Sequence, residues 1–126
     1  RQQPPGAQAG AGARAALPRC AEVCPQMRFL HYAEPGGFLP AHTDLPRRDW
    51  RAGTVSTHTF LLYLRGAEAA DSGGETVLLE GLGAGDGVLE RVAPVRGRLL
   101  IYPHDCAHQA LPVSRPPKLL LRGEMR

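Results

Sequence analysis

Residues 38–46, with the sequence FLPAHTDLP, contain a histidine and an aspartate two positions apart, His42 and Asp44. In a β-strand, side chains two positions apart lie on the same face, so this imidazole and this carboxylate would project together. With one more histidine they make a facial triad, which holds iron(II) and leaves positions open for a co-substrate and oxygen. The segment YPHDCAHQALPV offers two distant candidates for the third ligand, His104 and His108. Alone, the HxD pair is a weak signal.

The wider pattern around these residues resembles the iron(II)/2-oxoglutarate-dependent dioxygenases, specifically the prolyl 4-hydroxylase-like branch. It begins near residue 27, runs to the end of the chain and keeps the family's order and spacing. Each element is weak alone, but the ordered set is specific. The elements are Tyr32, Gly37, His42 with Asp44, Tyr63-Leu64, Gly73-Gly74-Glu75-Thr76, Gly97-Arg98-Leu99, His108, Pro112-Val113 and Lys118.

The resemblance implies that His42, Asp44 and His108 hold Fe(II). In the family pattern the distal histidine stands four residues before a Pro-Val pair and ten before a basic residue. His108 fits both counts and His104 fits neither. His104 is then a bystander or a hydrogen-bond donor behind the ligands.

The resemblance also implies a binding site for 2-oxoglutarate, whose far carboxylate needs a cation deep in the barrel, where a charge-assisted bond is strong. Lys118 matches the family position. Arg122 lies on the same face of the predicted last strand and is the second candidate anchor. Tyr32 and Tyr63 match family tyrosines that hydrogen-bond the co-substrate, and packing in the core is the alternative for each.

The loop LPRRDWRAGTV (45–55) joins the strand that carries the HxD pair to the next strand. In the resembled hydroxylases this connection closes over the bound target. Arg47, Arg48, Trp50 and Arg51 would make it a basic lid suited to a target with acidic groups. A solvated loop is the alternative interpretation.

The implied reaction is hydroxylation of a C–H bond, with release of succinate and CO2. A peptidyl proline is one candidate target, and the partner is a protein, a peptide or a small molecule. The implied cofactors are Fe(II), 2-oxoglutarate and O2, with ascorbate as an optional reductant. Asp44 favours hydroxylation, because halogenating members lack this carboxylate. Two alternatives are a non-catalytic member that kept the fold and a cupin-like metal-binding module that does not use 2-oxoglutarate.

The elements that must position these residues are short apolar runs separated by Gly and Pro turn signals. No stretch past residue 26 keeps a 3.6-residue period for three turns, so few or no helices are expected. Eight short strands in two sheets predict an all-β, double-stranded β-helix of the jelly-roll or cupin type, with a site at its mouth. The predicted strands are 27–34, 38–44, 56–66, 75–80, 88–94, 98–103, 106–113 and 118–125.

Composition limits the remaining possibilities. The chain of 126 residues divides into a Gly/Ala/Pro-rich lead-in, 1–25, and one dioxygenase domain, 26–126. A net charge of +3 without a dense basic run argues against a nucleic-acid partner. A nucleic-acid demethylase would also space its arginines differently. No apolar run approaches the ~20 residues that span a bilayer.

Three cysteines, an odd number, and no visible signal peptide favour the cytoplasm or nucleus. The chain begins with Arg1 rather than Met, which suggests a missing upstream segment. Family members usually carry helices ahead of the barrel that brace the larger sheet. If these are missing, one sheet face is bare and the fragment should aggregate or be marginally stable.

Overall fold

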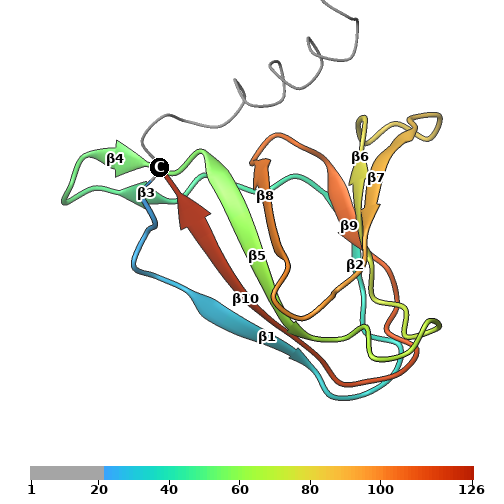
Figure 1. Cartoon of the computed structure of the whole chain (residues 1–126). Helices are drawn as coiled ribbons and strands as arrows, with labels where there is room; N and C mark the ends of the chain where they lie inside the picture. The colour runs from blue at the N-terminus through green and yellow to red at the C-terminus, as the bar shows by residue number, and fades with distance from the viewer. Residues whose placement is uncertain (1–21) are drawn as a thin grey trace, which may run out of the picture.

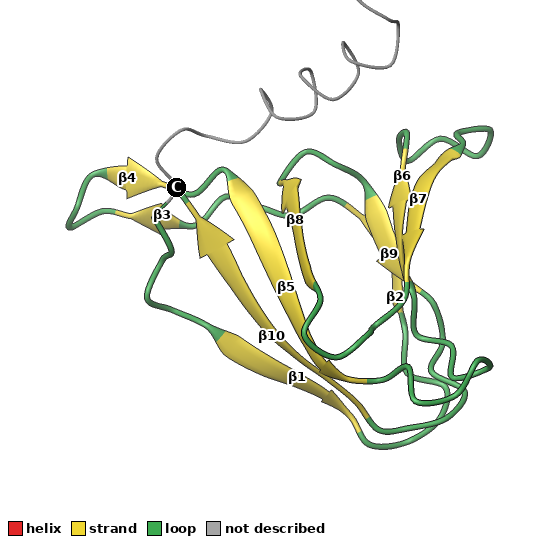
Figure 2. Cartoon of the chain, in the orientation of Figure 1, coloured by secondary structure: helices red, strands yellow, loops and turns green. Residues whose placement is uncertain are grey.

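The computed structural model describes residues 22–126, in which two four-stranded antiparallel sheets face each other (Figure 1). The larger sheet has the strand order β1 (Arg28–Tyr32), β10 (Lys118–Met125), β5 (His58–Arg65) and β8 (Leu99–Pro103). The smaller sheet has the order β2 (Leu39–His42), β9 (His108–Ala110), β6 (Thr76–Leu79) and β7 (Val88–Val92). Residues 22–126 contain no helix, as Figure 2 shows. The predicted double-stranded β-helix is confirmed.

The eight predicted strands correspond to these eight, and the structure adds a short hairpin. Strands β3 (Arg48–Asp49) and β4 (Thr54–Val55) pair within the segment 45–55, which the sequence indicated as a loop. The Asp49 carboxylate accepts the backbone N–H groups of Arg51 and Ala52, at 3.0 and 3.2 Å. This Asx-type turn is a local signal that accounts for the hairpin.

Residues 22–24 pair with the end of the chain, although the sequence assigned them to the lead-in. Glu22 and Arg126 exchange backbone hydrogen bonds of 2.8 and 2.9 Å, and the Cys24 N–H donates to the carbonyl of Glu124. Cys24 is buried. The ordered domain therefore includes residues 22–25, and the rest of the predicted lead-in lies outside the described residues.

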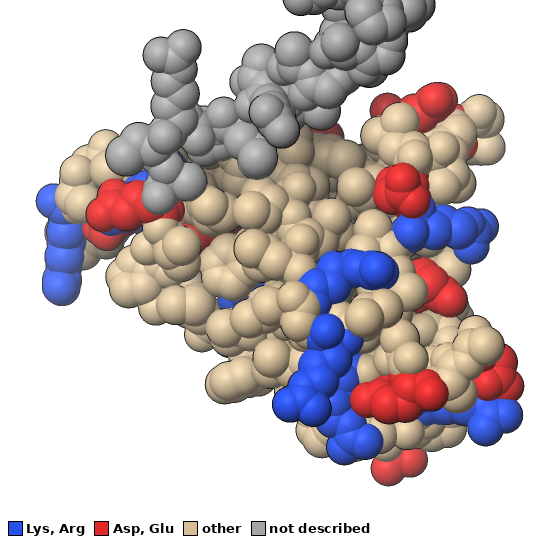
Figure 3. All heavy atoms as spheres, viewed as in Figure 1, with Lys and Arg blue, Asp and Glu red and all other residues tan. Residues whose placement is uncertain are grey.

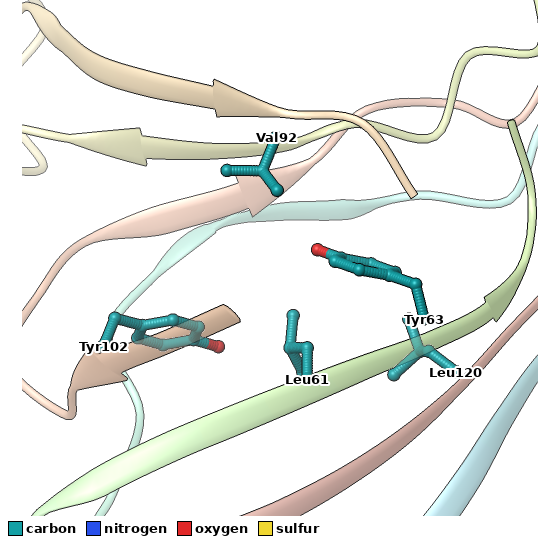
Figure 4. Close-up of a cluster of buried hydrophobic side chains, with 5 residues drawn as sticks. All are labelled: Leu61, Tyr63, Val92, Tyr102 and Leu120. Atoms are coloured by element: carbon teal, nitrogen blue, oxygen red, sulfur yellow. The ribbon is translucent and has the colours of Figure 1, made fainter. Parts of the chain in front are cut away.

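The hydrophobic core lies between the two sheets, because alternate residues of each strand point inward. Its central side chains are Leu61, Tyr63, Val92, Tyr102 and Leu120 (Figure 4). Val92 comes from the smaller sheet and the other four from the larger one. The Tyr63 hydroxyl is 2.5 Å from Thr76 Oγ1, so a hydrogen bond also joins the two sheets inside the core.

The outer face of the larger sheet carries a continuous apolar row. Phe29, Leu121, Leu62 and Leu99 are consecutive cross-strand partners on β1, β10, β5 and β8. Phe29 and Leu99, at the two ends of the row, are 67% and 55% exposed. Within residues 22–126 no element covers this face, which is the bare sheet that the sequence led us to expect. The expected aggregation stays a prediction.

The surface carries charged side chains of both signs (Figure 3), and the expected absence of a nucleic-acid partner stays a prediction. On the face shown in Figure 3, several basic side chains lie close together below the centre, with acidic side chains beside them. No helix among residues 22–126 has the length and hydropathy that crossing a membrane requires.

Candidate metal centre

Three potential metal ligands converge where β2 ends and β9 begins. His42 and His108 are cross-strand partners, and Asp44 follows two residues after His42. The Asp44 Oδ1 atom lies 3.4 Å from His42 Nε2 and 3.5 Å from His108 Nε2. One ligand atom from each of the three residues lies within 4.8 Å of the other two. The backbone therefore brings the HxD pair and the distal histidine to one point.

The donor set suits a divalent iron ion. Ligands about 2.1 Å from one ion and at right angles to each other lie about 3 Å apart, close to the spacing seen here. The Nδ1–H groups of His42 and His108 donate to the carbonyls of Pro40 and Cys106, at 2.7 and 3.0 Å. Each Nε2 therefore carries a lone pair that can bind a metal, and the Tyr102 hydroxyl lies 3.2 Å from that of His108. Burial lowers the pKa of His108, which keeps its imidazole neutral as a ligand must be.

Asp44 remains ionised although it is buried. Burial raises the pKa of this carboxyl group, but the hydrogen bond from Thr59 and the positive charge of Arg122 lower it more. The net result is a pKa below the ordinary value. Oδ1 faces the two histidines, while Oδ2 accepts the Thr59 hydroxyl at 2.6 Å and lies 3.3 Å from Arg122 Nη2. One oxygen is thus left for a metal and the other is held by the protein.

A chain of hydrogen bonds fixes the position of the Asp44 carboxylate. The Thr59 hydroxyl donates to Asp44 and accepts from His104 Nδ1 at 3.0 Å. The other nitrogen, His104 Nε2, accepts from the Ser56 hydroxyl at 2.7 Å, and Ser56 Oγ accepts the Arg47 N–H at 2.7 Å. Burial lowers the pKa of His104, which favours the neutral imidazole that this order of donors requires. His104 therefore supports Asp44 through Thr59 and does not join the ligand cluster.

Thr59→Val is expected to weaken metal binding 10- to 100-fold, the usual cost of losing a group that orients a ligand. Valine keeps the shape of threonine but removes the donor to Asp44 and the acceptor for His104. The measurement is Mn(II) affinity by electron paramagnetic resonance titration.

Thr54→Val is the matched control. The buried Thr54 hydroxyl finds no hydrogen-bond partner among the described residues, so its removal should leave Mn(II) affinity unchanged. Equal Mn(II) affinity in the Thr59→Val and Thr54→Val proteins would show that the hydrogen-bond chain through Thr59 does not position Asp44.

A cavity between the sheets joins the metal ligands to Lys118. It contains about 390 Å³ of space between protein atoms, its open mouth included, and His42 and His108 line one end. Lys118 begins β10 at the other end and is only 1% exposed. Its Nζ atom lies 4.9 Å from the centre of the Tyr32 ring, a cation–π contact. The sole lysine of the chain is thus an internal cation.

Glycine makes room for the Lys118 stem. Gly74 has φ +74°, and a Cβ there would lie 3.0 Å from Lys118 Cδ. Gly73 has φ +70° and packs on the Pro112 carbonyl, where no Cβ fits. The Gly-Gly pair therefore has a structural role, because it shapes the wall beside the Lys118 side chain.

Burial lowers the pKa of Lys118 to about 8, and the nearby Glu75 charge offsets part of this shift. Within residues 22–126 no carboxylate forms an ion pair with Lys118. A buried cation without a counter-ion suits an anionic ligand, because low dielectric strengthens the pairing.

This pKa predicts that, above pH 8, 2-oxoglutarate affinity falls with pH while the contribution of Lys118 to the free energy of unfolding rises. Below pH 8 the ammonium is charged, and 2-oxoglutarate affinity should be constant. Above pH 8 the affinity should fall up to about tenfold per pH unit as the charge is lost. Between pH 8 and 10.5 the unfolded chain holds this proton and the folded chain does not, so the lysine makes stability rise with pH.

Because the chain contains one lysine, labelling with [ε-¹³C]lysine gives one side-chain signal, which reports the titration directly. We expect a midpoint near pH 8 without 2-oxoglutarate and a higher midpoint with it. A midpoint at the ordinary lysine value without the ligand would contradict the burial of the ammonium.

The other predicted co-substrate residues lie in different surroundings. Tyr32 lines the cavity beside Lys118. Tyr63 is fully buried in the core, with its hydroxyl bonded to Thr76, and does not line the cavity. Arg122 lines the cavity but contacts Asp44 and also Glu124, the latter at 3.0 Å. Its role as a carboxylate anchor stays a prediction.

The predicted lid residues do not act as one group. Arg47 turns inward to Glu124 at 3.3 Å, and its side chain is 41% exposed. Trp50 is 77% exposed, and the Arg51 guanidinium lies 5.3 Å from the centre of its ring. Arg48 is exposed. Of the four, Arg47 is the residue that lies beside the metal ligands.

Sequence reasoning did not find Thr59 or Tyr102. Strand alternation places both on the inner face, where they are cross-strand partners. The Tyr102 hydroxyl is 3.2 Å from His108 Nε2, and burial raises the pKa of this tyrosine. No motif marks either residue, and alternation along β5 and β8 was the available signal.

Comparison with known proteins gives a consistent result. Residues 27–123 match the family model described as the 2OG-Fe(II) oxygenase superfamily. No curated protein matches the chain. Among solved structures, a prolyl-4-hydroxylase from Pseudomonas putida is similar at 28% identity, with a TM-score of 0.61 over 79% of this chain.

Two further structures share the fold. They are a viral collagen prolyl hydroxylase from Paramecium Bursaria Chlorella virus-1 and a prolyl 4-hydroxylase from Phytophthora capsici. The first is 16% identical over 96% of this chain and 68% of its own length, with a TM-score of 0.60. The second is 21% identical over 82% of this chain and 34% of its own length, with a TM-score of 0.59. The chain spans about half, 51%, of the Pseudomonas protein.

Proposed function

The chain belongs to the 2OG-Fe(II) oxygenase superfamily, and we propose that it hydroxylates a C–H bond of its target with Fe(II), 2-oxoglutarate and O2. His42, Asp44 and His108 are the proposed metal ligands, and Lys118 is the proposed anchor of 2-oxoglutarate. One observation carries the proposal: two of the three candidate ligands, His42 and His108, line the same cavity as the buried Lys118 ammonium. That arrangement fits a dicarboxylate that must reach both.

Bound Fe(II) with 2-oxoglutarate supplies the oxidising chemistry, while the protein supplies ligand geometry, orientation and exclusion of water. Lys118 sets the depth at which a carboxylate enters, and the hydrogen-bond chain through Thr59 holds Asp44 in one orientation. Four leucines along the cavity exclude water from the space between the anchor and the ligands, which strengthens the carboxylate–ammonium pair. They are Leu30, Leu39, Leu61 and Leu120.

The target is expected to approach beside His42, whose side chain is 37% exposed, whereas those of His108 and Asp44 are 7% and 5% exposed. A peptidyl proline is the leading candidate, because the similar Pseudomonas structure at 28% identity is a prolyl-4-hydroxylase. Other residues of proteins and small molecules remain in the proposed target class. Ascorbate as reductant and a cytoplasmic or nuclear location are parts of the same proposal.

The test is release of succinate from 2-oxoglutarate by the iron-loaded protein in the presence of ascorbate. A non-catalytic family member would bind no iron. A cupin-like module would bind iron without 2-oxoglutarate-dependent succinate release. Either result would refute the proposed activity, and the second would leave the metal site intact.

A further inference from the structure

A groove lined by three arginines lies beside the candidate metal ligands, and one of these arginines, Arg122, also lines the cavity that contains Lys118. Arg28 from β1, Arg47 from the segment after β2 and Arg122 from β10 line it together with Glu124. We call it the arginine groove. Asp44 itself lines this groove, so a molecule bound there lies next to the proposed metal.

The groove contains more positive than negative groups. Arg28 and Arg122 are direct cross-strand partners, a placement in which like charges repel. Glu124 pairs with both Arg47 and Arg122, at 3.3 and 3.0 Å. No carboxylate among residues 22–126 pairs with Arg28. Three guanidinium groups thus face two carboxylates.

A bound metal would increase this excess. Asp44 Oδ1 faces His42 and His108. A divalent ion bound between these three residues would add two positive charges beside the groove. The Arg122 side chain is 15% exposed, so its charge is only partly screened by water. An anion in the groove would relieve the repulsion between Arg28 and Arg122, and guanidinium groups hold carboxylates with two parallel hydrogen bonds.

We propose that the arginine groove binds a carboxylate of the target, so that the enzyme selects an acidic peptide with Asp or Glu near the hydroxylated residue. The inference rests on the proposed hydroxylase function and specifies its substrate class. Leu45, 85% exposed, and Pro46 line the same groove and give an apolar wall for the neighbouring part of the peptide. Of the four residues of the basic lid predicted from sequence, the arginine groove includes only Arg47. Its other two arginines, Arg28 and Arg122, come from the larger sheet.

The test uses the protein loaded with Mn(II) and N-oxalylglycine, an inert analogue of 2-oxoglutarate, and a random hexapeptide library. Retained peptides are sequenced. We expect Asp and Glu to be enriched about fivefold over Asn and Gln, the typical advantage of a charge-assisted over a neutral hydrogen bond. Arg28→Glu should remove this enrichment and favour peptides with Lys or Arg, because it puts a negative charge in the groove. Among residues 22–126 Arg28 has no carboxylate partner, so the substitution breaks no ion pair there.

Arg91→Glu is the matched control, since Arg91 is an exposed arginine of β7 in the other sheet. It should retain the acidic preference. Three results from protein that has bound Mn(II) would overturn the inference. They are a wild-type pool without acidic enrichment, an acidic enrichment that persists in Arg28→Glu, and an acidic enrichment that is lost in Arg91→Glu. Failure of the wild-type protein to bind Mn(II) would instead overturn the proposed function, and the inference with it.

Discussion

His108→Ala is expected to lower Mn(II) affinity by more than about 100-fold, beyond the cost of losing a group that only orients a ligand. The imidazole is buried, its Nδ1–H is held by the Cys106 carbonyl, and its Nε2 atom faces Asp44. Alanine offers no donor atom, and no other residue replaces it, since His104 is committed to Ser56 and Thr59. Succinate release should fall with metal occupancy.

Two other histidine variants test whether a loss of Mn(II) affinity is specific to His108. His31→Ala removes an exposed imidazole from the outer side of β1 and should leave Mn(II) affinity unchanged. His104→Ala should cause an intermediate loss, because it removes the acceptor and donor behind Asp44 but no ligand. Far-ultraviolet circular dichroism checks that each variant is folded. A His108→Ala protein that is folded and binds Mn(II) like His31→Ala would refute the ligand assignment.

Lys118→Met is expected to weaken 2-oxoglutarate binding strongly and to stabilise the ligand-free protein. Methionine fills much of the volume of the lysine stem without its charge. The bound carboxylate would lose a buried partner, a cost of about 3 kcal/mol or about 100-fold in affinity. The free protein would lose an ammonium whose pKa burial lowers to about 8. Avoiding that desolvation should raise the free energy of unfolding by about 1 to 3 kcal/mol near pH 7.

The opposite signs of the two effects distinguish an anchor from an ordinary buried lysine. Binding is measured by anaerobic calorimetry on the Mn(II)-loaded protein, and stability by urea unfolding without ligand. Arg65→Met serves as the control, because Arg65 is half exposed and pairs with the equally exposed Glu68. It should change neither quantity appreciably. A Lys118→Met protein that is less stable and still binds 2-oxoglutarate would refute the anchor.

Much of the fold could be predicted from the sequence, because short-range signals determine it. Gly and Pro bound each apolar run, and alternation within the runs assigns inner and outer faces. The same alternation placed Lys118 and Arg122 on one face, which the structure confirms, since both line the cavity. The hairpin within 45–55 was missed because strands of two residues have no detectable period.

The less predictable features depend on contacts between segments far apart in sequence. Alternation places Arg122 inside but does not say that Asp44 and Glu124 will be its partners. Arg47, just before the short hairpin, pairs with Glu124 near the end of the chain, and no local pattern marks this contact. The family pattern marks Tyr63 but does not say that its hydroxyl is bonded across the core to Thr76, and its contact with the co-substrate stays a prediction.

The buried position of Lys118 also determines how these 126 residues respond to amine chemistry. With one lysine in the sequence and 1% of it exposed, the folded domain presents no ε-amino group for acetylation or ubiquitin conjugation. Such modification requires local opening around the start of β10, and occupancy by a dicarboxylate would oppose that opening. If Lys118 anchors 2-oxoglutarate as proposed, modification of this lysine should therefore become slower as the concentration of 2-oxoglutarate rises.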